Sequence, residues 1–226
     1  MLLGGRTDGL GREKKGKNHN LLTAIAVVGI IGPILFWVLL LLAQSLHPGY
    51  DPWEDSVSRL IFGRFGWLQT ANFCFLTLFT AAFGAAVYIY IAKSVLSRFA
   101  SLLLIFMGLA QLLTAVFHVD VNPLGTKSLA YDIHNWVFIV SAGSFPFGAL
   151  LLVPCLWSDK RWRPFAYTTI IAVIVVLALD LLWLVSRPIE PHLIDPWFGV
   201  YERILLSVPL AWMIAISARI LFLVCQ

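Results

Sequence analysis

The segment of residues 118–134 contains side chains of types that bind metal ions. His118, Asp120 and His134 are acceptable zinc ligands, and Glu202 is a candidate general base beside them. Such a set would support metal-assisted hydrolysis. The chain contains no HExxH segment and no nucleophile elbow, so the spacing of known hydrolase motifs is missing. A metal site is therefore one of several open interpretations.

Haem binding is a second interpretation of the same histidines. Axial ligation needs two histidines that face each other across helices, and His118 with His134 is the pair that suits it. Both residues lie near the ends of apolar segments rather than deep inside them. We therefore predict no cofactor and keep zinc and haem as alternatives. The chain has neither a P-loop nor a GxGxxG segment after a strand, so nothing indicates nucleotide binding.

A wider group of ionisable residues lies within or beside long apolar segments. A charged side chain at the centre of a bilayer costs roughly 2.5–3.5 kcal/mol, so such residues turn inward and find partners. We expect a polar chamber that opens to the outer side of the membrane. Its predicted members are Arg59, Asp120, His134, Asp180, Glu202 and Arg203. The alternative is a structural role, in which Arg59 or Arg203 neutralises Glu202 and Asp180 and His134 bonds across a helix pair.

The elements that position these residues are predicted to be membrane-spanning helices. The chain of 226 residues is 60% hydrophobic and 12% charged, with a mean hydropathy of +0.86, whereas soluble domains have about 45–50% apolar and about 25% charged residues. A span needs about 20 mostly apolar residues. Six stretches qualify: Leu21–Leu46, Trp67–Ala92, Phe99–Val119, Ile133–Trp157, Phe165–Val185 and Trp197–Cys225. The sequence predicts an all-α membrane protein, a bundle of six transmembrane helices.

The distribution of basic residues predicts the orientation. Residues 1–20 contain Arg6, Arg12, Lys14, Lys15 and Lys17, and the positive-inside rule places such a segment in the cytoplasm. Both termini are then cytoplasmic, and we expect the inner (plasma) membrane of the cell. Residues 1–20 are predicted to form a flexible basic tail, and residues 21–226 a single six-helix domain. The net charge of +4 thus reflects topology, and no nucleic-acid partner is expected.

The first outer loop is predicted to contain a short interfacial helix that could cover the chamber. Asp51 suits the N-cap, Pro52 the first helical position and Glu54 a capping box, while Gly63 suits the C-terminal end. One face of this helix is apolar and consists of Trp53, Val57, Leu60 and Ile61. Arg59 falls on the other side, where we expect it to meet Glu202 or Asp120.

Short motifs spread along the chain resemble a prokaryotic membrane family known as domain of unknown function 998. They are Asp51-Pro52 with Ser58-x-Leu60, Gly63-x-x-Gly66-Trp67, Phe117-x-x-Asp120, His134 at the start of the fourth span, and Gly199-x-x-Glu202-Arg203. The resemblance covers about residues 45–220 and implies a six-helix membrane fold, without a definite activity. His118 stands where the family pattern has proline, and Arg59 where an acidic residue is common. Asp120, His134, Glu202 and Arg203 are therefore the better candidates for a shared role.

The functional hypothesis is an outward-facing polar chamber that binds a lipid headgroup or a small polar molecule. A role as an accessory subunit of a partner membrane protein is also compatible with this chamber. Membrane lipids are the expected partners, and a non-enzymatic role is favoured. The alternatives are an intramembrane metal-dependent hydrolase and a haem-binding membrane protein.

Overall fold

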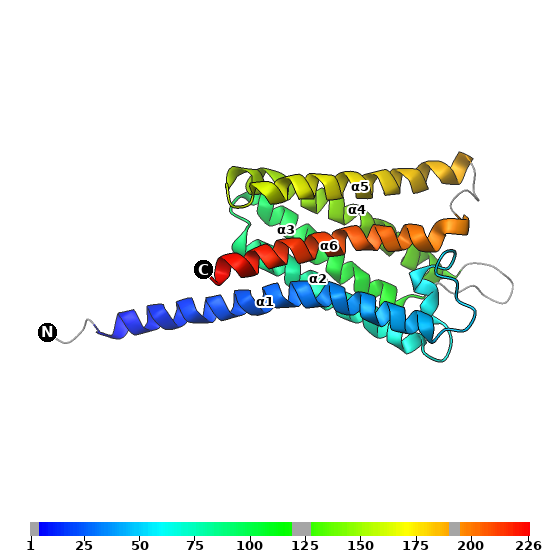
Figure 1. The fold of residues 1–226 in the computed structure, drawn as a ribbon, viewed down its shortest axis with the longest axis horizontal. Helices are drawn as coiled ribbons and strands as arrows, with labels where there is room; N and C mark the ends of the chain where they lie inside the picture. The colour runs from blue at the N-terminus through cyan, green and yellow to red at the C-terminus, as the bar shows by residue number, and fades with distance from the viewer. Residues whose placement is uncertain (1–4, 119–127, 190–194) are drawn as a thin grey trace.

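The computed structural model describes residues 5–118, 128–189 and 195–226 and consists of six α-helices and two short 3-10 helices (Figure 1). In chain order these are α1 (Gly5–Ser45), η1 (Val57–Ile61), α2 (Gly66–Tyr90), α3 (Val95–Val116), α4 (Leu129–Ser158), α5 (Arg163–Ile189), η2 (Asp195–Trp197) and α6 (Phe198–Val224). Within these residue ranges no β-strand occurs, which confirms the predicted all-α fold.

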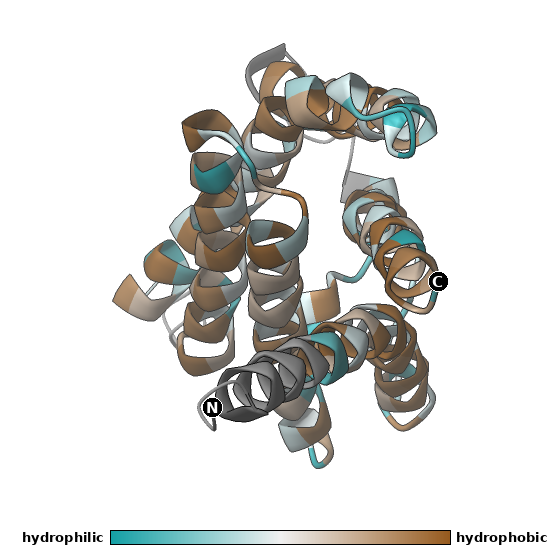
Figure 2. Ribbon diagram, turned by 90° about the vertical axis from the view of Figure 1, so that its left-hand side faces the viewer, coloured by the Kyte–Doolittle hydropathy of each residue, from teal (hydrophilic) through white to brown (hydrophobic). Residues whose placement is uncertain are grey.

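Each α-helix contains a segment that is long and apolar enough to cross a membrane. These segments are His19–Ser45, Gly66–Tyr90, Val95–Val116, Leu129–Ser158, Arg163–Val185 and Phe198–Val224. Figure 2, which looks along the bundle, shows hydrophobic residues along the helices. Outward side chains such as Leu78 and Leu184 are each 63% exposed, and a bilayer would cover them. The six-span, multi-pass architecture is confirmed, while the cytoplasmic position of the termini stays a prediction.

The first helix is longer than the span it contains. It begins at Gly5, whereas the sequence predicted a flexible tail over residues 1–20. Residues such as Lys14 and Lys15 are good helix formers, and a helix that is already nucleated in the apolar segment extends easily toward its N-terminus. The start of the span in α1 lies beside the C-terminal end of α6, since the His19 ring nitrogen Nε2 is 3.1 Å from the Val224 carbonyl oxygen.

Helices that follow one another in the chain pack side by side, and α1 closes the arrangement by packing against α6 as well as α2. The α2–α3 pair comes especially close, because a Cβ atom on Gly108 would lie 2.7 Å from the Ala81 backbone nitrogen. Small residues commonly allow such close approach in membrane bundles. Helix α5 packs mainly against α4 and less extensively against α6, which leaves space between α5 and α6.

The α1–α2 loop (residues 46–65) differs in detail from the predicted helix. Its helical part is only η1, which is capped by Ser56 rather than by Asp51. Glu54 precedes this cap, so the predicted capping box does not form. The Asp51 carboxylate instead accepts from the Trp53 backbone nitrogen at 2.8 Å, a local turn that competes with helix formation. Gly63 follows η1 and has a φ angle of +84°, in the left-handed region that favours glycine. η1 packs against α1, α2 and α6, so it is part of the bundle.

Candidate functional site

The first turns of α6 hold the α1–α2 loop in place. Gly199, Glu202 and Arg203 lie at helical positions i, i+3 and i+4, and therefore on one face of α6. A Cβ atom on Gly199 would lie 2.5 Å from the Pro52 carbonyl oxygen and 2.6 Å from the Asp55 carbonyl oxygen. Glycine is thus the residue that admits the backbone of the loop to the surface of α6.

Glu202 is the acidic residue of this face and is only 5% exposed. Its Oε2 atom accepts a hydrogen bond from the Val57 backbone nitrogen at 2.6 Å. Hydrogen bonds to a carboxylate are short and strong, and a buried polar group needs such a partner. Glu202 therefore fixes the start of η1 against α6.

Arg203 contacts a different part of the loop. Its guanidinium donates to the Gly199 carbonyl oxygen at 2.7 Å, to the Asp55 carbonyl oxygen at 3.3 Å and to the Tyr50 hydroxyl at 2.7 Å. The Tyr50 hydroxyl in turn donates to the carbonyl oxygens of Asp55 and Ser56. Burial raises the pKa of Tyr50 to about 12, although the nearby Arg203 acts in the opposite direction. The tyrosine hydroxyl is therefore protonated at neutral pH and able to donate.

His134 lies in α4 and is 3% exposed. Its Nε2 atom is 2.9 Å from the Ser58 hydroxyl oxygen, and its Nδ1 atom is 2.7 Å from the Phe117 carbonyl oxygen. A carbonyl oxygen can only accept, so Nδ1 carries the proton in this arrangement. In the neutral ring, Nε2 is then the acceptor and Ser58 the donor. The hydrogen bond to Phe117 holds the ring at the C-terminal end of α3, where the last carbonyl groups have no partner within the helix.

A polar cavity of about 400 Å³ lies between the loop and helices α4 and α6. It falls in the size range of typical small-molecule sites. Its lining residues are Ser56, Ser58, Arg59, Phe62, Tyr131, His134, Asn135, Phe138, Phe198 and Glu202. The cavity thus combines hydroxyl, amide, imidazole, guanidinium and carboxylate groups from η1 and its flanks, α4 and α6.

Three of the six predicted chamber residues line this polar cavity, namely Arg59, His134 and Glu202. Arg59 forms an ion pair with Asp55 and not with Glu202, one of its two expected partners. The reason is local, since Asp55 stands four residues before Arg59 at the start of η1. The other expected partner, Asp120, lies outside the described residues.

The other three predicted residues lie elsewhere. Arg203 is on α6 beside Glu202 but turns toward Tyr50. Asp180 lines a separate cavity of about 220 Å³ with Tyr201 and Trp183. Asp120 falls outside the described residues. Of the five predicted members that the structure describes, three therefore line the polar cavity, Asp180 lines another cavity and Arg203 lines neither.

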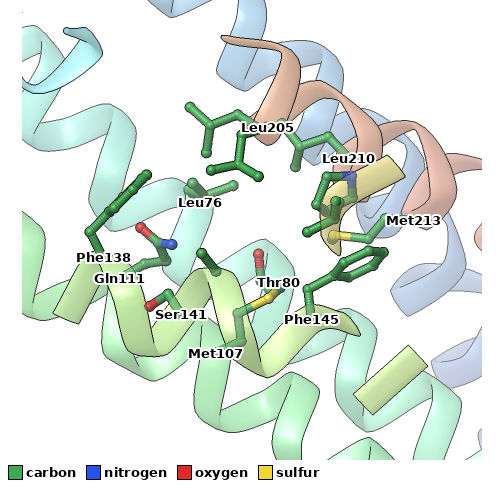
Figure 3. Close-up of a pocket in the computed structure, with 14 residues that line it drawn as sticks. Leu76, Thr80, Met107, Gln111, Phe138, Ser141, Phe145, Leu205, Leu210 and Met213 are labelled. Atoms are coloured by element: carbon green, nitrogen blue, oxygen red, sulfur yellow. The ribbon is translucent and has the colours of Figure 1, made fainter. Parts of the chain in front are cut away.

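Two further cavities share the lining residue Phe138 with the polar cavity. This side chain lines the polar cavity and also a narrow apolar cavity of about 50 Å³ inside the bundle (Figure 3). Figure 3 shows Phe138 beside Gln111 and Ser141, with Leu205 across the space. Phe138 also lines the 220 Å³ cavity that contains Asp180. Phe138 thus lies at the boundary between the polar cavity and two cavities that are mainly apolar.

The two histidines proposed as metal or haem ligands both contact other protein atoms. Both ring nitrogens of His134 are hydrogen-bonded to protein atoms, so metal binding there would require one of these bonds to break. His118 contacts the Ala115 carbonyl oxygen at 3.2 Å, within its own helix end. Among the described side chains, no three of the metal-binding types come together. Asp120 was the third predicted ligand and is not among them.

Several residues of the site were not singled out as functional from the sequence. Ser58 was noted only as part of a short motif, because its neighbours Ser56 and Arg59 are also polar and nothing in the local sequence distinguishes it. Tyr50 and Phe138 carried no signal, because aromatic residues are common near the ends of spans. Trp53 and Trp197 belong to two Asp-Pro-Trp segments, and their rings pack edge to face at 5.6 Å.

Comparison with known proteins gives one match. The model of a family described as protein of unknown function (DUF998) matches residues 30–219, which is most of the chain. No curated protein and no solved structure matches. The matched range includes all the motifs that meet around the polar cavity.

Proposed function

Because the chain belongs to the DUF998 family, whose function is unknown, its role has to come from its site, and we propose that it binds a membrane lipid. The polar headgroup would occupy the cavity beside Ser58, His134 and Glu202. The apolar chain would pass Phe138 into the spaces between the helices. The observation that carries this proposal is that Phe138 lines polar and apolar cavities at once.

The chemistry of the two regions suits an amphipathic ligand. In the polar cavity, the Glu202 carboxylate and the hydroxyl groups of Ser56 and Ser58 can accept hydrogen bonds, and Asn135 and Arg59 can donate them. This mixture of charges favours an uncharged or zwitterionic headgroup over a strongly anionic one. A small water-soluble ligand would not explain the adjoining apolar space.

Two cavities lined in part by α5 support a route from the bilayer. The 220 Å³ cavity is lined by residues of α4, α5 and α6, including Ile139 and Leu184. A further apolar cavity of about 350 Å³ lies between α5 and α6 and is lined by residues such as Ile171 and Val208. Since α5 packs less extensively against α6 than against α4, this side of the bundle is where a lipid chain could enter.

Cross-linking with a photoreactive lipid tests the proposal. The full-length protein is placed in vesicles of phosphatidylethanolamine that contain a phospholipid with a diazirine in its acyl chain, and cross-linked residues are mapped by mass spectrometry. We expect adducts on cavity residues such as Phe138, Ala142 and Leu205. Adducts confined to outward residues such as Leu78 would overturn the proposal, because bulk lipid produces that result.

Two substitutions in α4 sharpen the test. Asn135→Trp places a large ring in the polar cavity and should reduce the cavity adducts several-fold, because the headgroup is excluded. Phe147→Trp is the matched control, since Phe147 is on the same helix and is 64% exposed. An equal reduction in both variants would argue against a specific site.

A further inference from the structure

We propose that Ser58 and His134 form a nucleophile and its general base, and that they cleave an acyl ester in the bound lipid. The inference rests on the proposed lipid binding and adds a reaction to it. Its starting point is the hydrogen bond of 2.9 Å between the Ser58 hydroxyl and the His134 Nε2 atom.

The geometry is that of an activated hydroxyl group. A general base must lie within about 2.6–3.2 Å of the proton that it removes, and a third group must orient it. Nε2 is within this range of Ser58, and the Phe117 carbonyl oxygen holds Nδ1 at 2.7 Å. With the proton on Nδ1, the free electron pair of Nε2 is directed at the serine hydroxyl. The backbone carbonyl of Phe117 thus serves as the orienting group of the pair.

The pair is placed where a substrate could reach it. Ser58 is 6% exposed and His134 is 3% exposed, yet both line the polar cavity, so their small exposed surface faces that space. Asn135 and Arg59 line the same cavity and carry N–H groups. Such donors can stabilise the negative charge that develops on a carbonyl oxygen during acyl transfer.

Holding η1 in place does not by itself require this serine–histidine contact. The first N–H group of η1 is bonded to Glu202, and the side chain of Ser56 caps the helix by accepting from the Arg59 nitrogen. The Ser58 hydroxyl is therefore an additional polar group turned toward a histidine at the wall of a cavity. That arrangement is what a nucleophile requires.

The reaction proceeds in two steps with water as the second substrate. The Ser58 oxygen attacks the ester carbonyl carbon and forms a new C–O bond, while its proton passes to His134 Nε2. The ester C–O bond to the alcohol portion breaks, and the leaving oxygen takes the proton from His134. Water then attacks the carbonyl carbon of the acyl-serine and forms a new C–O bond, while His134 Nε2 accepts one of its protons. The bond between this carbon and the Ser58 oxygen breaks, and the proton on His134 returns to Ser58 and regenerates its hydroxyl group. The products are a fatty acid and a lipid alcohol.

Labelling with a fluorophosphonate probe tests the pair directly. The full-length protein in mild detergent is treated with the probe, and the adduct is located by mass spectrometry. We expect the phosphonyl group on Ser58, no adduct at that position in Ser58→Ala, and labelling at least about 100-fold slower in His134→Gln. Ser144→Ala should label like the parent, since Ser144 is on α4 and bonds to the Val140 carbonyl oxygen.

The outcomes separate this inference from lipid binding. Failure of the probe to label Ser58 in the folded parent protein, or equal labelling rates in the parent and His134→Gln, would overturn the nucleophile. The parent result does not depend on whether any variant folds. Cavity cross-links without Ser58 labelling would leave lipid binding in place and remove the reaction. Labelled Ser58 with lipid cross-links only on outward faces would overturn the lipid ester as substrate.

Discussion

The guanidinium of Arg203 donates to the hydroxyl of Tyr50 over 2.7 Å and lies 5.7 Å from the centre of its ring. The two residues are 153 positions apart. The contact joins the sixth helix to the segment that follows the first helix. Together with the bond from Glu202 to the backbone of Val57, it fixes the α1–α2 loop as one wall of the polar cavity.

Replacing Arg203 should destabilise the protein far more than replacing His118. Arg203→Ala removes donors to Gly199, Asp55 and Tyr50, and hydrogen bonds to charged groups contribute about 1.5–3 kcal/mol each. His118 contacts the Ala115 carbonyl oxygen, within its own helix end. We expect a lower melting temperature and a lower folded yield for Arg203→Ala than for His118→Ala in detergent. Equal values would contradict the role given to Arg203.

Tyr50 should make the protein sensitive to alkaline pH. Burial raises the folded-state pKa of Tyr50 to about 12, from an ordinary value of 10.0. The unfolded state therefore loses its proton first, so the stabilisation is complete below pH 10 and is lost as the pH rises through about 12. Tyr50→Phe should melt at a lower temperature than the parent at pH 9, and the difference should narrow as the pH approaches 12. A constant difference would show that Tyr50 does not titrate in this way.

Gly199 should tolerate no side chain. In Gly199→Ala the new methyl group would overlap the carbonyl oxygens of Pro52 and Asp55, so the loop would have to move away from α6. We expect a loss of about 1–3 kcal/mol, typical of overpacking, measured by thermal unfolding. Gly143→Ala is the matched control, because a Cβ there would have no atom of another helix within 4 Å. A similar loss in both variants would point to helix backbone effects instead.

The oxygen of Glu202 should matter to the fold more than its charge. Glu202→Gln keeps an acceptor for the Val57 N–H group, whereas Glu202→Ala leaves that group without its partner, at a cost of about 1–3 kcal/mol. We therefore expect Glu202→Ala to melt well below Glu202→Gln. If the two variants were equally unstable, the carboxylate charge would be the more important property.

The spans could be predicted from sequence because apolar length alone defines them. The predicted span Trp67–Ala92 compares with Gly66–Tyr90 in the structure, and Phe165–Val185 with Arg163–Val185. The helical extension of α1 to Gly5 was not predicted, since several glycines in that segment indicated flexibility.

The site could be predicted only in part. Glu202 and His134 stand out as ionisable residues in apolar helices, and both line the polar cavity. Asp180 has the same sequence signature but lines another cavity, because the rotation and packing of α5 decide which space its side chains reach. Ser58 was missed as a candidate since its partner His134 is 76 positions away, and no local pattern reveals such a pairing.

The long separation between the partners also has a consequence for synthesis. Tyr50, Val57 and Ser58 come early in the chain, but two of their three anchors, Glu202 and Arg203, belong to the last of the six spans. While the ribosome is still synthesising the middle helices, the α1–α2 loop is already made but has neither of these two anchors. The cavity can close only when the sixth helix has been inserted, so an incomplete chain cannot present the finished site.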